Sequence, residues 1–186
     1  MYFQTKKFKR HLFIALTVLL AIALVIPLAS LFQKRPEEQQ GPTTQSLYER
    51  QADLEALLAS DPLNPEALVE LGEIYLANRD LEPAMEMFKQ ALALDPLNDD
   101  ALYNVAEMNY ANGEHDLAIS QLETLVANNP NYADASLLLG YAYGVGKNDY
   151  TAAIQALENY VAVAEPGASV ETVKQTIEDW RKIINE

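Results

Sequence analysis

Cysteine is absent from the 186 residues, and histidine occurs only twice, as His11 and His115. The absence of cysteine excludes disulfide scaffolds, thiol catalysis, thiolate zinc sites and iron–sulfur clusters. Two isolated histidines argue against a histidine-based metal site or triad, and no glycine-rich phosphate loop, H-E-x-x-H motif or EF-hand loop is present. Paired acids such as Asp99 and Asp100 lack an accompanying base or nucleophile. The sequence therefore predicts a protein that is not an enzyme and that needs no cofactor or metal.

Acidic residues are missing from the start of the chain, because the first one is Glu37. Six basic residues precede it, so residues 1–35 carry a net charge of +6. Residues 36–186 hold seven basic and 27 acidic residues, a net charge of −20. A body this acidic repels phosphate groups, so we expect no nucleic acid partner.

Charge is also absent from Leu12 to Phe32, a run of 21 residues. As a helix this run would rise about 31 Å at roughly 1.5 Å per residue, which matches the hydrocarbon core of a bilayer. The run therefore predicts a single transmembrane helix over residues 12–32, after a basic tail over residues 1–11. A cleaved signal peptide is the alternative, although its apolar region is usually shorter and followed by a small-residue cleavage site.

The basic residues on the two sides of this segment predict its direction. Four precede it and two follow it, Lys34 and Arg35, and the side richer in lysine and arginine tends to stay cytoplasmic. We therefore expect a single-pass protein of the inner or plasma membrane, with a cytoplasmic N-terminus and an extracytoplasmic acidic domain. The difference of two charges leaves the opposite orientation open.

A proline-containing linker over residues 33–45 leads into a repeat. Prolines stand at positions 62, 96 and 130, a spacing of 34 twice over. The first unit reads Leu68-x2-Leu71-Gly72-x2-Tyr75, then Ala84-x3-Phe88, Ala91 and Pro96. This order resembles the tetratricopeptide repeat (TPR), with Leu68 in place of its leading tryptophan.

The resemblance extends over two further units. In the second, Asn109 stands where Tyr75 stood, and the third needs one extra residue in the turn from Gly144 to Asp149. It implies an all-α solenoid of helix-turn-helix units, three of them over residues 61–166. We expect capping helices over 46–60, with Leu54 and Leu57 in the places of Phe88 and Ala91, and over 167–186. The second cap should pack Trp180 on the third unit and share one apolar stripe among Val170, Val173, Ile177, Trp180 and Ile184.

Single residues have local roles in this frame. Gly72 and Gly140 are small where the two helices of a unit should cross closely. Asn64 and Asn98 should cap the helices that follow them, and Gly113 suits a left-handed turn after a helix.

The resemblance also implies a groove lined by the first helix of each unit. Transferred position by position, its lining is Glu66, Val69, Glu73, Leu76, Asp100, Tyr103, Glu107, Tyr110, Asp134, Leu137 and Tyr141. Acids mixed with aromatic and aliphatic side chains suit a peptide or amphipathic helix with basic and apolar residues. Several of these residues could instead pack internally or be solvated. Some TPR proteins clamp acidic chaperone C-termini with basic groups, and the acidic and apolar residues here argue against that class.

We therefore expect a membrane-anchored TPR scaffold that binds a protein or peptide. Its layout is similar to that of bacterial TPR proteins that assist envelope assembly, including c-type cytochrome maturation, and to anchored partners of the secretion machinery. A self-assembling structural component of an envelope complex, and hence a homo-oligomer, is the alternative.

Overall fold

The computed structural model describes residues 44–185, and all of the regular structure in this range is helical. The elements are α2 (Thr44–Ser60), α3 (Pro65–Ala77), α4 (Leu81–Leu94), α5 (Asp99–Ala111), α6 (His115–Asn128), α7 (Ala133–Tyr141), the π-helix η1 (Ala142–Lys147), α8 (Tyr150–Val163) and α9 (Ala168–Asn185). The predicted transmembrane helix over 12–32 lies outside the described residues. Among the helices described, none is long and apolar enough to cross a membrane.

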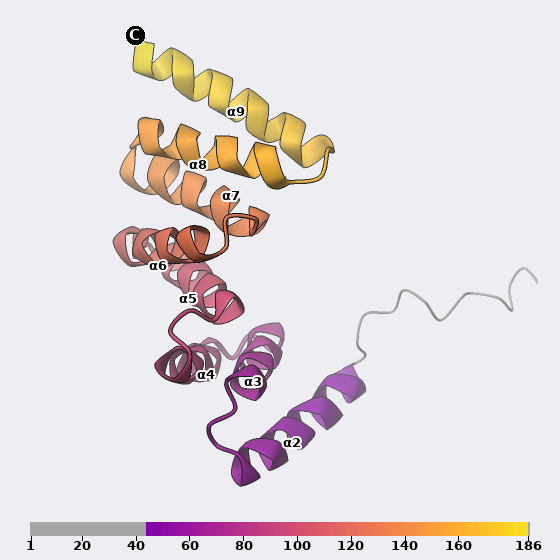
Figure 1. Cartoon of the computed structure of the whole chain (residues 1–186). Coiled ribbons are helices and arrows are strands. Elements are labelled where there is room, and N and C mark those ends of the chain that lie inside the picture. The colour runs from indigo at the N-terminus through magenta and orange to yellow at the C-terminus, as the bar shows by residue number, and fades with distance from the viewer. Residues whose placement is uncertain (1–43, 186) are drawn as a thin grey trace, which may run out of the picture. The chain divides into compact units, whose positions relative to one another are not determined.

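The helices stack in chain order as antiparallel pairs (Figure 1). Helices α3 and α4, α5 and α6, and α7 and α8 form the three hairpins, while α2 packs on α3 and α9 packs on α8. Buried side chains form clusters within and between these pairs, and one cluster joins Phe88 of the first hairpin to Val105 of the second. The structure is the all-α solenoid that the repeat predicted.

Small residues allow the two helices of a hairpin to approach closely. A Cβ atom on Gly72 would lie 2.7 Å from Cε1 of Phe88, and one on Gly140 would lie 2.4 Å from Cδ2 of Leu157. Both distances are too short for real atoms, so a larger residue at either glycine would require the opposing side chain or the helices to move. The predicted close crossing is confirmed at both glycines.

Asparagines begin the first helices of two units. The side-chain oxygen of Asn64 accepts from the Ala67 N–H, and that of Asn98 accepts from the Ala101 N–H, each at 2.9 Å. These bonds satisfy backbone donors that would otherwise lack a partner at the helix start. The capping predictions are therefore confirmed.

The turns inside the first two hairpins need a left-handed residue. Gly113 has φ +81°, as expected, but the equivalent position of the first hairpin holds Arg79 at φ +66°. This conformation costs a non-glycine residue about 1–2 kcal/mol. Glycine avoids that cost, but part of the gain is lost because glycine makes the unfolded chain more flexible.

We therefore expect Arg79→Gly to raise the free energy of unfolding by about 0.5–1 kcal/mol. Equilibrium chemical denaturation measures the change. Gly113→Ala is the matched control and should lower stability by about 1 kcal/mol. A loss of stability in Arg79→Gly would contradict this explanation of the turn.

The extra residue of the third unit is accommodated by η1. The Asp149 N–H donates to the Tyr143 carbonyl, whereas in the first hairpin the Asp80 N–H donates to the Tyr75 carbonyl, one residue fewer along the chain. The wide π-helical turn begins at Ala142, two residues earlier than the turn that we expected to hold the insertion. π-Helical segments are mostly single turns set into α-helices, and η1 follows α7 directly, without a break between them.

A helix lies at each end of the three hairpins, α2 and α9, and two of the side chains that we expected them to bury are exposed. Leu54 is buried, but Leu57 is 42% exposed because α2 has no described helix on its outer side. Trp180 packs on the third unit as expected, since a Cβ atom on Gly144 would lie 2.4 Å from its ring. Ile184 is 48% exposed and not part of the buried stripe. Trp180 already reaches Tyr150, the first residue of α8, so Ile184 extends beyond that helix.

Candidate functional site

The residues predicted to line a groove all lie on α3, α5 and α7. Their acids are exposed and most of their aromatic and aliphatic side chains are half-buried. Val69 differs, because it is only 7% exposed and packs in the cluster that contains Phe88. Its side chain therefore serves the core and is not available to a partner.

Two tyrosine rings lie at the centre of this surface. Tyr103 of α5 stacks on Tyr132, which directly precedes α7, with ring centroids 5.5 Å apart and planes 27° apart. The Tyr132 hydroxyl donates to Oδ1 of Asp100 at 3.2 Å. The pair thus joins the second unit to the third.

Tyr132 is absent from the predicted groove residues. It occupies the position held by the capping residues Asn64 and Asn98 in the earlier units, and no side-chain cap replaces them at α7. The change from asparagine to tyrosine at this repeat position is the sequence signal that could have identified Tyr132.

Carboxylates surround the tyrosine pair. Burial, together with the nearby Glu107 and Asp134, raises the pKa of Tyr103 to about 12. The pKa of Tyr132 is also raised, first by burial and then by Asp100. These shifts place the acids within electrostatic reach of both rings.

The same surface continues toward the first unit. Burial raises the pKa of Glu73, and the negative charges of Asp100 and Glu70 raise it further. We call the set Glu73, Asp100, Tyr103, Glu107, Tyr132 and Asp134 the acidic tyrosine face. It spans the three first helices and brings together five of the predicted residues.

Within residues 44–185, none of the four carboxylates on the acidic tyrosine face forms an ion pair. The adjacent Glu70 differs, because Arg50 of α2 donates two hydrogen bonds to it and lowers its pKa. The negative charge of the face is therefore not neutralised by the described part of the chain.

The outer predicted residues pack at separate places. Tyr110 contacts the ring of His115, with centroids 5.2 Å apart, and Tyr141 contacts Trp180 edge-on at 6.3 Å. Leu76 and Leu137 pack at the edges of two different buried clusters. Glu66 is exposed in the first turn of α3. These residues border the acidic tyrosine face and are not part of its centre.

The raised pKa of Tyr103 has a measurable consequence. Because its folded value of about 12 exceeds the ordinary value near 10, folding favours the neutral phenol. The resulting stability is present below about pH 10 and is lost as the pH rises through the folded pKa. In an ultraviolet titration of phenolate formation, Tyr103→Phe should remove a late-titrating group. Removal of a group that titrates near pH 10 would contradict this environment.

Metal binding finds no support in the described part of the chain. Residues 44–185 contain no group of three or more histidine, aspartate or glutamate side chains that could hold a metal ion. The chemistry available to the acidic tyrosine face is recognition, by carboxylates that attract cations and by aromatic rings that contact apolar groups or cations.

Comparison with known proteins assigns the repeats. Residues 51–96 and residues 80–140 each match a tetratricopeptide repeat model. The crystal structure of MamA shares 27% identity, covers 73% of this chain and 82% of that chain, and has a TM-score of 0.60. The Sgt2 TPR domain from Aspergillus fumigatus shares 27% identity, covers 66% and 80% respectively, and has a TM-score of 0.56.

A third solved structure shares the fold alone. The first TPR of Spaghetti, bound to the HSP90 peptide SRMEEVD, shares 17% identity, covers 66% of this chain and 94% of that chain, and has a TM-score of 0.58. No curated protein matches the sequence. Residues 51–140 therefore consist of tetratricopeptide repeats, and the described helices form an all-α TPR solenoid.

Proposed function

We propose that this chain is a non-enzymatic scaffold whose acidic tyrosine face binds a protein segment that carries basic and apolar residues. The observation that supports this most strongly is the group of four carboxylates that form no ion pair within residues 44–185, arranged around the stacked rings of Tyr103 and Tyr132. Charges of one sign on a surface steer and select partners of the opposite sign. Half-buried tyrosines offer large contact area at low entropic cost.

The TPR fold supports a role in protein binding. In the Spaghetti structure the bound peptide SRMEEVD contains three acids and one arginine. The acidic tyrosine face has the opposite character, because its charged side chains are all carboxylates. We therefore propose the same general activity with a partner of opposite charge.

We further propose that the scaffold is held at a membrane by residues 12–32, with the repeats on the extracytoplasmic side. The support is the length of the uncharged run and the distribution of basic residues around it. Such a placement suits a protein that assists assembly in the cell envelope, for example in c-type cytochrome maturation.

Reversal of two charges tests the proposed face. The full-length chain carrying Asp100→Lys and Asp134→Lys should lose at least about 90% of captured partner after crosslinking in cells, since both new lysines repel a basic segment. Glu165→Lys and Glu171→Lys together are the matched control, because they change the net charge equally at exposed sites away from the face. Equal capture by the two variants would remove the acidic tyrosine face from the proposal.

A further inference from the structure

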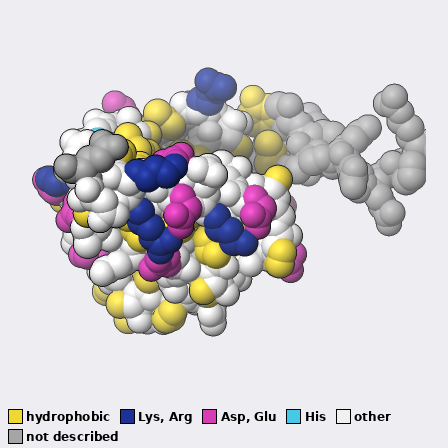
Figure 2. Space-filling view, turned by 90° about the horizontal axis from the view of Figure 1, so that it is seen from above, with side chains coloured by type: hydrophobic (Ala, Val, Ile, Leu, Met, Phe, Trp, Pro, Cys, Tyr) yellow, Lys and Arg dark blue, Asp and Glu magenta, His cyan; other side chains and the backbone are white. Residues whose placement is uncertain are grey.

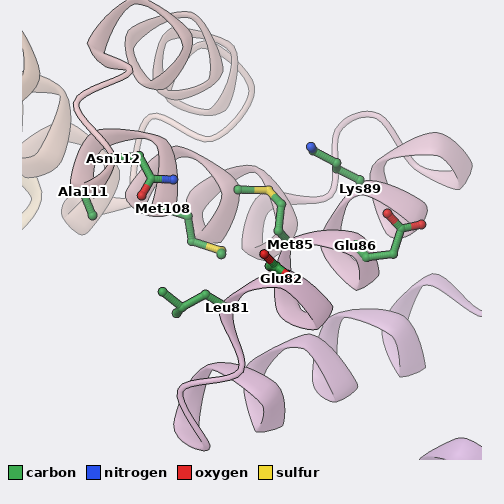
Figure 3. A pocket seen from close by; sticks show the side chains of 8 residues that line it. All are labelled: Leu81, Glu82, Met85, Glu86, Lys89, Met108, Ala111 and Asn112. Carbon is green, nitrogen blue, oxygen red and sulfur yellow. The ribbon is translucent and has the colours of Figure 1, made fainter.

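A concavity lies between α4 and α5, and none of its lining residues belongs to the acidic tyrosine face. It has a volume of about 490 Å³. Met85 and Met108 point into it from the two helices, and Leu81 lies at one end (Figure 3). Its lining is Leu81, Glu82, Met85, Glu86, Lys89, Met108, Ala111 and Asn112. Methionine side chains adapt to irregular apolar surfaces, which suits a binding cleft.

The next junction of the solenoid shows how this space is closed elsewhere. His115 is the counterpart of Leu81, and Gly146 is the counterpart of Ala111 when both are counted from the left-handed residues Asn148 and Gly113. A Cβ atom on Gly146 would lie 2.6 Å from the His115 ring. Ile119, the counterpart of Met85, is only 8% exposed. At the α4–α5 junction Met85 is half-buried, and the neighbouring Leu81 is 55% exposed. Apolar surface that is covered in one junction is therefore open in the other.

The open junction also lacks a cation at the place that Lys147 takes in the closed one, although Lys89 lines another part of the cleft. In the closed one, Nζ of Lys147 lies 2.6 Å from Oδ1 of Asp116. The counterpart of Asp116 is Glu82, and the counterpart of Lys147 is Asn112, because Lys147 and Asn112 directly precede the left-handed residues Asn148 and Gly113. Glu82 consequently has no basic partner among the residues that the structure describes. An occupant that completes the α4–α5 junction must supply apolar side chains next to a lysine or arginine.

The C-terminal end of α9 has this chemistry. Ile183 and Ile184 are 49% and 48% exposed, and Lys182 directly precedes them. Within residues 44–185, Lys182 forms one ion pair, with Asp179 one turn away on the same helix, and both side chains are well exposed. Such surface pairs are weak enough to exchange.

Charge also favours α9 as a contact between copies. Three of the seven basic residues after position 35 lie on it, Lys174, Arg181 and Lys182, together with three acids. The face at this end of the solenoid shows basic and acidic side chains side by side (Figure 2). A neutral helix in a domain of net charge −20 is the part that a second copy can approach with least repulsion.

We infer that the α4–α5 cleft binds the Lys182–Ile184 end of α9 from a second copy of this chain. The two isoleucines cover Met85, Met108 and Leu81, and Lys182 pairs with Glu82. The Lys182–Glu82 pair between two molecules would correspond to the Lys147–Asp116 pair within one molecule. It uses neither ring of the acidic tyrosine face, so it leaves that face open to another partner.

The absence of cysteine allows a direct test with the full-length chain. One tagged copy carries Met85→Cys, a second copy with another tag carries Ile184→Cys, and a short bismaleimide is added to lysates of cells that produce both. We expect an adduct that contains both tags. The matched control replaces Ile184→Cys by Tyr48→Cys, because Tyr48 is similarly exposed, at 59%. An adduct no more abundant than this control would overturn the inference.

Charge exchange separates the contact from general stickiness. Glu82→Lys in the first copy should reduce the adduct about fivefold or more, and Lys182→Glu in the second should restore it. Circular dichroism checks that both variants keep their helicity. No response to Glu82→Lys, or a Met85→Cys adduct only with a different protein, would overturn the inference. Asp100→Lys with Asp134→Lys should leave the adduct unchanged, so the outcome is distinguishable from failure of the proposed function.

Discussion

Phe88→Ala should lower the free energy of unfolding by about 3–5 kcal/mol, the range for removal of a fully buried aromatic ring. The Phe88 side chain is 0% exposed and lies directly against Gly72. It belongs to the cluster that includes Val105 of the second hairpin. Each repeat is stabilised mainly by contacts with the adjacent repeats. The cavity left by the missing ring should therefore also weaken the interaction between the first two units. Equilibrium chemical denaturation followed by circular dichroism measures both effects.

Leu94→Ala is the control on the same helix. Leu94 is 39% exposed, so its truncation should change stability by about 0.5 kcal/mol or less. Similar losses in the two variants would show that the α3–α4 crossing is not the place where this hairpin is held together.

Tyr103→Ala should have the largest effect on partner binding, a loss of affinity of about 30-fold or more. Tyrosines at the centre of an interface commonly contribute 2 kcal/mol or more. Here the substitution also removes the ring on which Tyr132 stacks. The captured partner, once identified, can be titrated onto the purified chain by calorimetry.

Two variants separate the ring from its hydroxyl and from general effects. Tyr103→Phe keeps the stack and should bind within about threefold of the unaltered chain. Tyr48→Ala removes an exposed tyrosine from α2 and should bind equally well. A loss in Tyr103→Phe as large as in Tyr103→Ala would place the recognition in the hydroxyl.

The repeat frame is predictable because it depends on local rules. The proline spacing fixes the length of a unit, and Gly72 must be small because Phe88 lies on it. The caps at Asn64 and Asn98 depend on only three or four neighbouring residues. Patterns of this kind survive in a single sequence.

The structure differs from the sequence-based predictions where packing between units decides how a residue is placed. The sequence indicated one extra residue in the third unit. It did not predict the π-helix that holds this residue, nor the contacts of Gly144 with Trp180 and of Gly146 with His115. Ile184 has the spacing of the buried stripe, but it is 48% exposed because no helix described by the structure lies opposite it. Helical periodicity predicts which way a side chain points. It does not predict whether a neighbouring helix extends far enough to cover that side chain.

The acidic tyrosine face was predicted only in part for the same reason. Position within the repeat identifies Tyr103, Asp100 and Glu107, whereas Tyr132 precedes its helix and joins the face only because neighbouring units stack. Among the described residues, whether a carboxylate of the face forms an ion pair depends on where each basic side chain lies in space. The predictions for residues 1–43 remain predictions.

Photo-crosslinking from native tyrosine positions tests the central claim most directly. A photoreactive phenylalanine placed singly at Tyr103, Tyr132 or Tyr48 in the full-length chain, in intact cells, reports what each position touches. Binding at the acidic tyrosine face predicts that Tyr103 and Tyr132 capture the same protein and that Tyr48, on α2, does not. Capture from Tyr48 alone, or equal capture from all three, would contradict the claim.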